Sequence, residues 1–266
     1  MTSTRLSCSN PLNLLNLQLP SPAEQLAADE AVLDAGEAGD GGETLIFWEP
    51  RETFVVVGYA NKVASEVNVA ACEKKNIPIF RRCSGGGTVV QMPGGLNYSL
   101  ILKITENSPT RSITSANQFI MEKNRAAVAT LLLALNPQLS TLNCLIRGHT
   151  DLTLVTHPAS RITEKKFAGN SQRRRKNFLL FHGTFLLNCD LKLISQLLVM
   201  PSLEPDYRAH RPHQDFVTNL NLPAGQIKAA LATAWNANEE ITNLPLEKIS
   251  KLAREKYSTP AWNRKF

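Results

Sequence analysis

The sequence has no long apolar run, no closely spaced cysteine pair and neither of the two common glycine-rich nucleotide motifs. The longest apolar stretches, such as NFLLFHGTFLL, are interrupted by polar residues and fall short of the roughly 20 residues that span a bilayer, so we expect no membrane-spanning helix. The five cysteines are odd in number and none lies in a CxxC motif, which argues against a disulfide framework and a zinc site. Neither GxGxxG nor GxxxxGK occurs, so the dinucleotide fingerprint and the P-loop are both absent.

The N-terminal stretch MTSTRLSCSNPLNLLNLQLP carries a single cation, and no small-residue cleavage site follows it. We therefore expect no secretory signal and a cytoplasmic protein. With 266 residues, 43% of them hydrophobic, the chain is long enough to bury a full core. We predict an N-terminal extension over residues 1–20 and one large domain over residues 21–266, without a separate accessory domain.

Basic residues exceed acidic ones and gather in one segment. The formal net charge is +6, and in RITEKKFAGNSQRRRK, residues 161–176, seven of sixteen residues are Arg or Lys. Such a local concentration of positive charge indicates an anionic partner. For the cluster from Arg173 to Lys176 we favour a solvated hairpin tip. The alternative is a nucleic-acid-binding module, but the run lacks interleaved aromatic residues and no known nucleic-acid-binding motif accompanies it.

Predicted helices and strands follow one another without a regular βαβ rhythm. Ser21, Pro22 and Glu24 form a helix start, and we expect this helix to end near Leu33 in a glycine-rich loop over residues 35–42. Further helices are predicted at residues 68–77 with Asn68 as cap, 113–135, 224–237 and 245–257. Short β-rich runs predict strands at residues 44–50, 54–58, 78–83, 96–104, 142–148, 151–157 and 177–188.

The strand predicted at residues 96–104 has two unequal faces. One face carries Leu96, Tyr98, Leu100, Leu102 and Ile104, and the other carries Asn97, Ser99, Ile101 and Lys103. Together with the mixed order of elements, this pattern predicts the α+β class, with a mixed, mostly antiparallel sheet packed against helices.

The stretch RRCSGGGTVVQMPGGLNYSLIL, residues 81–102, holds the most informative motif. Three successive glycines, Gly85 to Gly87, remove every Cβ from a length of backbone, so a ligand can approach the peptide N–H groups. Arg81 and Arg82 stand before them and supply fork-shaped cationic donors suited to a phosphate. We interpret the loop as an anion or nucleotide cradle; the alternative is a glycine-rich hairpin with two solvated arginines.

The order of motifs along the chain resembles the catalytic domain of lipoate-protein ligases, in the wider family that also holds biotin-protein ligases and octanoyltransferases. The resemblance covers roughly residues 21–263. It depends on the 81–102 stretch followed by DLTL, KKFAGNSQRRR, FHGTFLL, DYRAHRPHQDFV and the ending YSTPAWN. A GRGRxG-like loop, typical of biotin ligases, is absent. The fold implied by the resemblance, a mostly antiparallel mixed sheet packed against helices, agrees with the one predicted above.

The resemblance implies that ATP, with Mg²⁺, activates lipoate or octanoate to an acyl adenylate. The acyl group then passes to a lysine on a lipoyl-carrier domain of a 2-oxoacid dehydrogenase complex or on the glycine cleavage H protein. Catalysis of this kind needs positioning and fixed positive charge rather than an acid/base pair. A separate accessory protein is a further implied partner, whereas nucleic acid and membrane are not.

The resemblance also implies roles for individual residues. Lys166 would bridge the acyl carbonyl and the phosphate, Arg82 would contact the phosphate, and Asp151 would help to hold Mg²⁺. Strict alternation places Lys165 and Lys166 on opposite faces of an extended segment, so only one of them can enter the site. The remaining residues implied in nucleotide and acyl binding are Ser84, Gly85, Gly86, Gly87, Thr88, Val89, Val90, Gly169, Asn170 and His182.

One motif departs from the ligase pattern. Many ligases of this type have a His-Asp pair after the glycine loop, where this chain has Gln91 and Met92, which leaves the substrate preference open. The runner-up activity is an ATP-independent octanoyltransferase that forms a thioester on a cysteine. Cys144 lies where such a thiol would fall, but its setting LNCLIRG is typical of a strand, so we interpret it as a buried structural thiol. We expect the same of Cys83.

Overall fold

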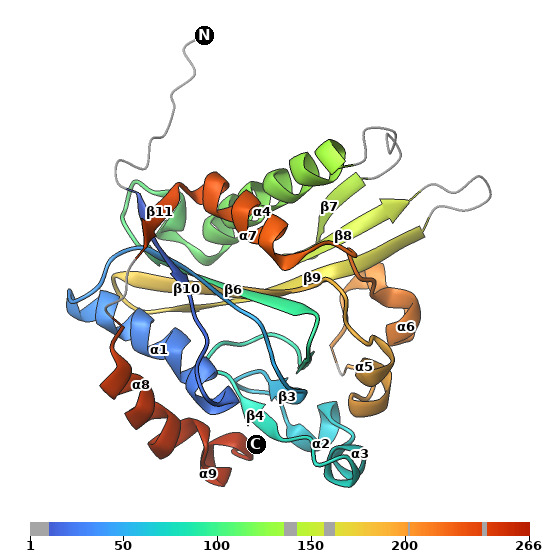
Figure 1. Cartoon of the computed structure of the whole chain (residues 1–266). Coiled ribbons are helices and arrows are strands. Elements are labelled where there is room, and N and C mark those ends of the chain that lie inside the picture. The colour runs from blue at the N-terminus through green and yellow to red at the C-terminus, as the bar shows by residue number, and fades with distance from the viewer. Residues whose placement is uncertain (1–10, 136–142, 157–162, 202, 241–243) are drawn as a thin grey trace.

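An eight-stranded mixed sheet forms the centre of the protein (Figure 1). The computed structural model describes residues 11–135, 143–156, 163–201, 203–240 and 244–266. The strand order is β11-β1-β2-β6-β10-β9-β8-β7; β1 pairs parallel with β11 and β2, and every pair from β2 to β7 is antiparallel. The predicted α+β class with a mostly antiparallel sheet is therefore confirmed.

The strands of this sheet are β1 Leu12–Asn16, β2 Thr44–Trp48, β6 Gly95–Lys103, β7 Asn143–Arg147, β8 Asp151–Thr156, β9 Thr163–Arg174, β10 Phe178–Leu186 and β11 Ala237–Glu240. A smaller sheet of order β4-β3-β5 contains β3 Phe54–Val57, β4 Ile79–Arg81 and β5 Val89–Gln91. The predicted strands are all present. The sequence patterns did not reveal β1, β5, β9 or β11. Of these, β1 lies within the predicted N-terminal extension and pairs with β2 and β11.

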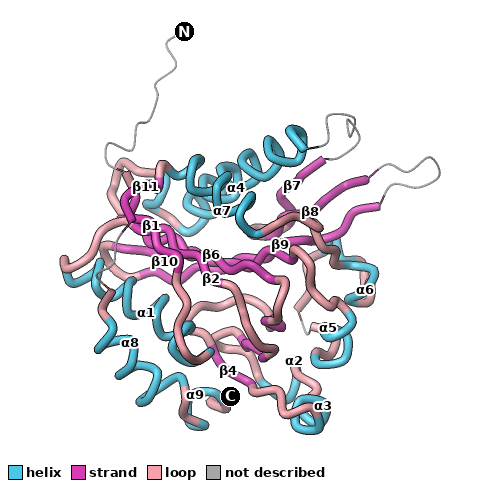
Figure 2. The backbone as a smooth tube through the Cα atoms, in the orientation of Figure 1, coloured by secondary structure: helices cyan, strands magenta, loops and turns pink. Residues whose placement is uncertain are grey.

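Helices cover both faces of the large sheet (Figure 2). The α-helices are α1 Pro22–Ala38, α2 Val63–Glu66, α3 Val69–Lys74, α4 Ile113–Leu135, α5 Lys192–Leu197, α6 His213–Phe216, α7 Ala224–Trp235, α8 Leu246–Leu252 and α9 Pro260–Asn263. Helices α4 and α7 cover one face, while α1 and α8 lie on the opposite side together with the smaller sheet (Figure 1). None of the helices in the described part of the chain has the length and apolar character needed to cross a membrane.

Strand β6 confirms the two predicted faces. Leu96, Tyr98, Leu100 and Leu102 belong to the core under α4 and α7. On the other face Asn97 and Ser99 are also buried, so this polar face points into the protein rather than into solvent. Buried polar groups require partners, and those of Asn97 and Ser99 come from Gln91, Thr184 and Asp29.

Helix α1 begins where the sequence predicts and ends later. Ser21 caps it by accepting from the Glu24 N–H, but the helix continues past Leu33 to Ala38 and is closed by Gly39 at φ 90°. The predicted end was wrong because the last turn has tertiary partners. Its acidic side chains bind the turn between β9 and β10: Asp34 pairs with Arg175, and Glu37 accepts from the N–H groups of Asn177 and Phe178.

Arg81 is a buried structural residue, so neither interpretation made from the sequence holds for it: its guanidinium is neither a phosphate donor nor solvated. Its side chain is fully buried and donates to five backbone carbonyls. The carbonyls belong to Gly58, Tyr59, Asn61, Trp262 and Asn263. Asn263 also accepts from the Arg81 N–H through its side chain. One guanidinium thus fastens helix α9 to the loop that follows β3.

We expect Arg81→Ala to destabilise the fold by at least about 3 kcal/mol, because each buried carbonyl left without a donor costs about 1–3 kcal/mol. Urea unfolding of the variant beside Arg264→Ala, which removes an exposed arginine from the same segment, measures the effect. Equal free energies of unfolding for the two variants would show that Arg81 does not hold α9.

Candidate active site

The glycine loop between β4 and β5 is folded around the side chain of Arg82. The guanidinium donates through Nε to the Ser84 hydroxyl and through Nη2 to the carbonyls of Gly85 and Gly87. Complete burial lowers the pKa of Arg82 to about 10, which still leaves it charged at neutral pH. The side chain that was predicted to contact a phosphate is therefore already engaged in shaping the loop.

The opposite side of the loop presents unpaired N–H groups. In a trans peptide the C=O and the following N–H point in opposite directions, so the carbonyls held by Arg82 turn the N–H groups of Gly86 and Thr88 away from it. Among the described residues, nothing accepts a hydrogen bond from the backbone N–H of Gly85, Gly86, Gly87 or Thr88. The three glycines are exposed, and a Cβ on Gly85 or Gly87 would meet no atom within 4 Å. The loop therefore exposes backbone N–H groups that an anion can bind.

Two glycine positions permit this loop. Gly86 has φ +81°, a conformation that side-chain-bearing residues rarely adopt. The loop also passes directly over Gly58 at the end of β3, where a Cβ would overlap the carbonyl oxygen of Gly86. The requirement at Gly58 was not visible in the sequence, because only the fold brings residues 58 and 86 together.

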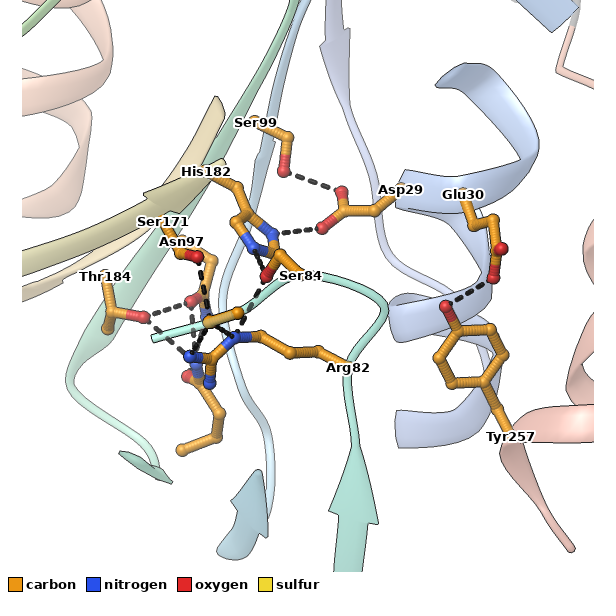
Figure 3. Close-up of polar contacts among 12 residues, drawn as sticks. Asp29, Glu30, Arg82, Ser84, Asn97, Ser99, Ser171, His182, Thr184 and Tyr257 are labelled. Carbon is orange, nitrogen blue, oxygen red and sulfur yellow. Dashed lines mark hydrogen bonds and ion pairs between the residues drawn. The ribbon is translucent and has the colours of Figure 1, made fainter. Parts of the chain in front are cut away.

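Ser84 and His182 meet beneath the loop, although they are far apart in sequence. The Ser84 hydroxyl lies 2.6 Å from His182 Nε2, and His182 Nδ1 lies 2.6 Å from the carboxylate of Asp29 on helix α1 (Figure 3). The Ser84 side chain is buried and faces away from the open side of the loop. Asp29 was not among the residues selected from the sequence.

The residues after the glycines lead from the loop into the smaller sheet. Thr88 and Val89 are half-buried, whereas Val90 is buried among the apolar residues around α5 and α6. Gln91, which stands where many ligases have histidine, exchanges amide hydrogen bonds with Asn97 and donates to Thr184. Gln91 is therefore a buried structural residue here.

Lys166 reaches the same side of the sheet as the loop because of a bulge in β9. Leu152 pairs with Ala168 but Thr153 pairs with Lys166, so Phe167 is one extra residue in β9. Phe167 and Ala168 consequently both enter the core under α4. The bulge turns Lys166 onto the face of Gly169, where its ammonium lies 2.8 Å from the position a Gly169 Cβ would occupy.

The Lys166 ammonium is paired with Asp151. Its Nζ lies 2.8 Å from one carboxylate oxygen of Asp151, and the other oxygen accepts from the Tyr207 hydroxyl at 2.6 Å. Burial and the Asp151 charge raise the pKa of Tyr207, so it stays a donor. Lys165 has a different neighbour and donates to the Gln214 carbonyl.

Asp151 does not offer a ready Mg²⁺ site in this arrangement. Both of its oxygens are engaged, and the described residues contain no group of three or more His, Cys, Asp or Glu side chains placed to hold a metal ion. Mg²⁺ commonly binds through one or two carboxylates together with substrate phosphates. The described side chains therefore form no site for a resident metal ion, and Asp151 as a ligand of Mg²⁺ that arrives with ATP stays a prediction.

Asn170 is the last residue in a series of buried side chains joined by hydrogen bonds. The Trp235 indole donates to Asn124, Asn124 donates to the Tyr98 hydroxyl, and Tyr98 donates to the Asn170 side chain at 2.7 Å. Asn170 in turn donates to the Thr150 carbonyl. This series fixes the strand segment that carries Gly169 against helices α4 and α7.

The basic run on β9 is largely engaged within the protein, and the expectation of a solvated hairpin tip was wrong for its three arginines. Arg173 donates to the Cys83 carbonyl, Arg174 to the carbonyls of Thr110 and Arg111, and Arg175 to Asp34. Only Lys176 of this cluster is exposed. The sole argument for a nucleic-acid-binding module is thereby weakened.

The described cysteines are all buried free thiols. Burial raises the pKa of Cys144 and Cys83 to about 12 and that of Cys189 to about 11, and it also raises the pKa of Cys72. Cys144 lies on β7 within the core under α4, as its strand-like setting predicted. Cys8 lies outside the described residues.

Comparison with known proteins gives a consistent result. Residues 21–232 match the family model of the lipoyl protein ligase A/B catalytic domain. Lipoate-protein ligase A subunit 1 of Thermoplasma acidophilum is 26% identical, with 94% of this chain and 95% of that protein covered. Octanoyltransferase LipM of Geobacillus kaustophilus is also 26% identical, with 92% and 94% covered.

The solved structures agree in fold. A bipartite lipoate-protein ligase from T. acidophilum, solved as part of a lipoylation system with its E2 lipoyl domain, superposes with a TM-score of 0.77 at 24% identity, covering 96% of each chain. A lipoate-protein ligase A bound with ATP gives a TM-score of 0.76 at 24% identity, covering 96% of this chain and 99% of that one.

We expect Gly58→Ala to lower the free energy of unfolding by about 1–3 kcal/mol, the usual cost of inserting a group where there is no room. Gly225→Ala, at an exposed site where a Cβ meets nothing within 4 Å, is the control and leaves stability unchanged or slightly higher. Thermal unfolding of both variants tests this; a Gly58→Ala protein as stable as wild type would mean that the loop does not press on Gly58.

Proposed function

This chain belongs to the lipoyl protein ligase A/B catalytic domain family, and we propose that it is an ATP-dependent ligase that joins lipoate or octanoate to a lysine of a carrier protein. The reaction has two steps. The acid's carboxylate attacks the α-phosphorus of ATP, which releases pyrophosphate and forms an acyl adenylate. The acceptor lysine's neutral amine then attacks the acyl carbon, which releases AMP and one proton.

The observation that supports the proposal is that strand β9 carries the Lys166 ammonium and, on the same face, contacts the glycine loop. Gly169 and Ser171 share a face of β9, because side chains two apart point the same way. The Lys166 ammonium lies over Gly169, and the Ser171 hydroxyl donates to the Gly85 carbonyl of the glycine loop. With about 3.3 Å per residue, the ammonium lies roughly 7 Å along the strand from the loop contact. That spacing suits a nucleotide that the loop binds by its phosphates and whose α-phosphate lies near Lys166.

Each part of the site would then have one task. The N–H groups of residues 85–88 would bind phosphoryl oxygens, with Arg82 behind them holding the loop in shape. Lys166 would exchange its pairing with Asp151 for the incoming carboxylate and α-phosphate, and would later polarise the acyl carbonyl when the amine attacks. Thr88, Val89 and Gly169 would line the nucleotide and acyl sites. The Asn170 side chain faces the core under α4, where it meets Tyr98 and Met121, and would act by fixing the strand. Mg²⁺, where it accompanies ATP, would supply charge neutralisation on the phosphates.

The relatives support the choice of substrates and partner. One solved relative is described as bound with ATP and another as bound with lipoic acid. A third is a two-part ligase described together with an E2 lipoyl domain. We propose that the acceptor here is likewise a lipoyl-carrier domain, that an accessory protein can assist, and that the enzyme acts in the cytoplasm.

A cysteine-dependent octanoyltransferase is the second candidate, because proteins named octanoyltransferase are as similar in sequence as the ligases. The thiolate is the nucleophilic form of cysteine, and a thiol with a pKa of about 12 is ionised at only roughly one part in 100,000 at pH 7. Cys144 is thus poorly suited to that role as it stands in the core.

Exchange of labelled pyrophosphate into ATP, measured with lipoate and then with octanoate, tests the proposed function directly. A ligase catalyses exchange that depends on the acid. Acyl transfer from an octanoylated carrier without ATP, in the absence of any exchange, would assign the chain to the transferases instead.

We expect Lys166→Ala to slow both adenylate formation and transfer from pre-made acyl adenylate by at least about a hundredfold, the scale for removing one preorganised stabilising group. Lys165→Ala, one residue away with its ammonium on the Gln214 carbonyl, should be nearly silent in both. Single-turnover assays of each half-reaction distinguish them. Wild-type rates for the Lys166 variant in either half-reaction would place the catalytic cation elsewhere.

We expect Cys144→Ser to keep most of the ATP-dependent activity, because a buried thiol that does no chemistry is replaced by a group of similar size. Mass spectrometry of the wild-type protein incubated with octanoyl carrier should show no acyl group on Cys144. A folded but inactive variant together with such an adduct would establish the thioester mechanism.

A further inference from the structure

A directional chain of hydrogen bonds joins helix α1 to the glycine loop. Arg82 Nε donates to the Ser84 hydroxyl oxygen at 3.0 Å, and the Ser84 hydroxyl contacts His182 Nε2 at 2.6 Å. His182 Nδ1 contacts one oxygen of Asp29 at 2.6 Å, and Ser99 donates to the other oxygen at 2.6 Å (Figure 3). All five side chains are nearly or fully buried.

Only one arrangement of the protons in this series of hydrogen bonds gives every donor an acceptor. A carboxylate only accepts, so the proton between His182 and Asp29 belongs to Nδ1. In a neutral imidazole Nε2 then carries a lone pair, and it accepts the Ser84 hydroxyl proton. The Ser84 oxygen is left free to accept from Arg82. Asp29 therefore determines, through His182, which way the Ser84 hydroxyl faces.

The three side chains have the order and distances of a Ser-His-Asp catalytic triad, but Ser84 is not placed to act as a nucleophile. Its side chain is buried, with 1% of the residue exposed, and its oxygen already accepts from a cation. The exposed side of the loop carries the N–H groups of residues 85–88 instead. The chemistry of this array is therefore orientation of Arg82 and not covalent catalysis.

We infer that Asp29 is a positioning residue for nucleotide binding, acting through His182 and Ser84 on Arg82 and hence on the glycine loop. Arg82 has a fixed planar geometry: its Nε is shared between the Ser84 hydroxyl and the Gly85 carbonyl, and its Nη2 reaches the carbonyls of Gly85 and Gly87. Without the Asp29 charge, the proton of His182 is no longer held on Nδ1 and can move to Nε2. Nε2 then no longer accepts from Ser84, and the Ser84 hydroxyl can rotate. The loop N–H groups then lose the arrangement that receives the phosphates. The inference rests on the proposed function in taking ATP as the ligand.

A double-mutant cycle on ATP affinity tests the coupling. Asp29→Asn and Ser84→Ala should each weaken ATP binding by about tenfold, and the double variant also by about tenfold instead of the roughly hundredfold expected of independent sites. Asp34→Asn is the matched control, an acid-to-amide change on the same helix whose carboxylate faces Arg175 and not the loop. It should leave ATP affinity unchanged and combine additively with Ser84→Ala. Wild-type affinity for Asp29→Asn, or effects that multiply in the double variant, would overturn the inference.

The histidine tautomer gives a second readout that needs no nucleotide to bind. Nitrogen NMR of the ¹⁵N-histidine-labelled wild type, with His182→Gln to assign the signal, should show neutral His182 protonated at Nδ1. Asp29→Asn should populate the Nε2-protonated form, as an amide does when it replaces the triad carboxylate of serine proteases. If His182 of the wild-type protein carries its proton on Nε2, the inference about Asp29 is refuted, whatever the pyrophosphate exchange assay shows. If the tautomer is the expected one but no exchange is found, only the proposed ligase function is rejected.

Discussion

The burial of one guanidinium determines the shape of the glycine loop. Arg82 is removed from water, and a buried charge needs hydrogen-bond acceptors around it. The loop supplies them from its own backbone, so the carbonyls of Gly85 and Gly87 cannot turn outward without leaving the charge unpaired. Because each peptide is planar and trans, the same constraint sends the neighbouring N–H groups outward. The anion-binding face of the loop is thus a direct consequence of how a positive charge is accommodated inside the protein.

Two adjacent pairs of charged residues extend this constraint to the rest of the molecule. Arg81 is the last residue of strand β4 and Arg82 follows it. Their side chains point in opposite directions, so one holds helix α9 and the other holds the loop. On helix α1 the neighbours Asp29 and Glu30 divide in the same way. Asp29 serves the loop array. Glu30 accepts from Tyr257 (Figure 3) and from Lys256, both in the C-terminal segment. Burial alone would raise the pKa of Glu30, but these two hydrogen bonds hold it below the usual value. The C-terminal segment and the glycine loop are therefore secured by neighbouring residues of the same two elements.

The sequence predicted what depends on local pattern and missed what depends on tertiary contacts. The alternation of β6 gave both faces correctly, and the caps Ser21 and Asn68 marked real helix starts, because these signals are set within a few residues. Asp29 and Glu30 left no comparable signal: acidic residues in a helix ordinarily favour solvent, and only the packing of α1 between the sheet and the C-terminal segment buries them. The two arginines before the glycines look alike in sequence, and their different roles follow from alternation at the end of β4. Gly58 could not be selected either, since its partner Gly86 is 28 residues away.

For Lys166, the alternation argument made from the sequence was incomplete. Strict alternation groups odd-numbered residues of β9 on one face, which would place Lys165 with Gly169 and Ser171 beside the glycine loop. The extra residue at Phe167 reverses this assignment, because a bulge inserts one position without advancing the partner strand. A bulge cannot be recognised from alternation, since it is a break in the alternation itself. Here it also sends Phe167 and Ala168 into the same core, and that burial of two successive apolar residues stabilises the register that delivers Lys166 to the site.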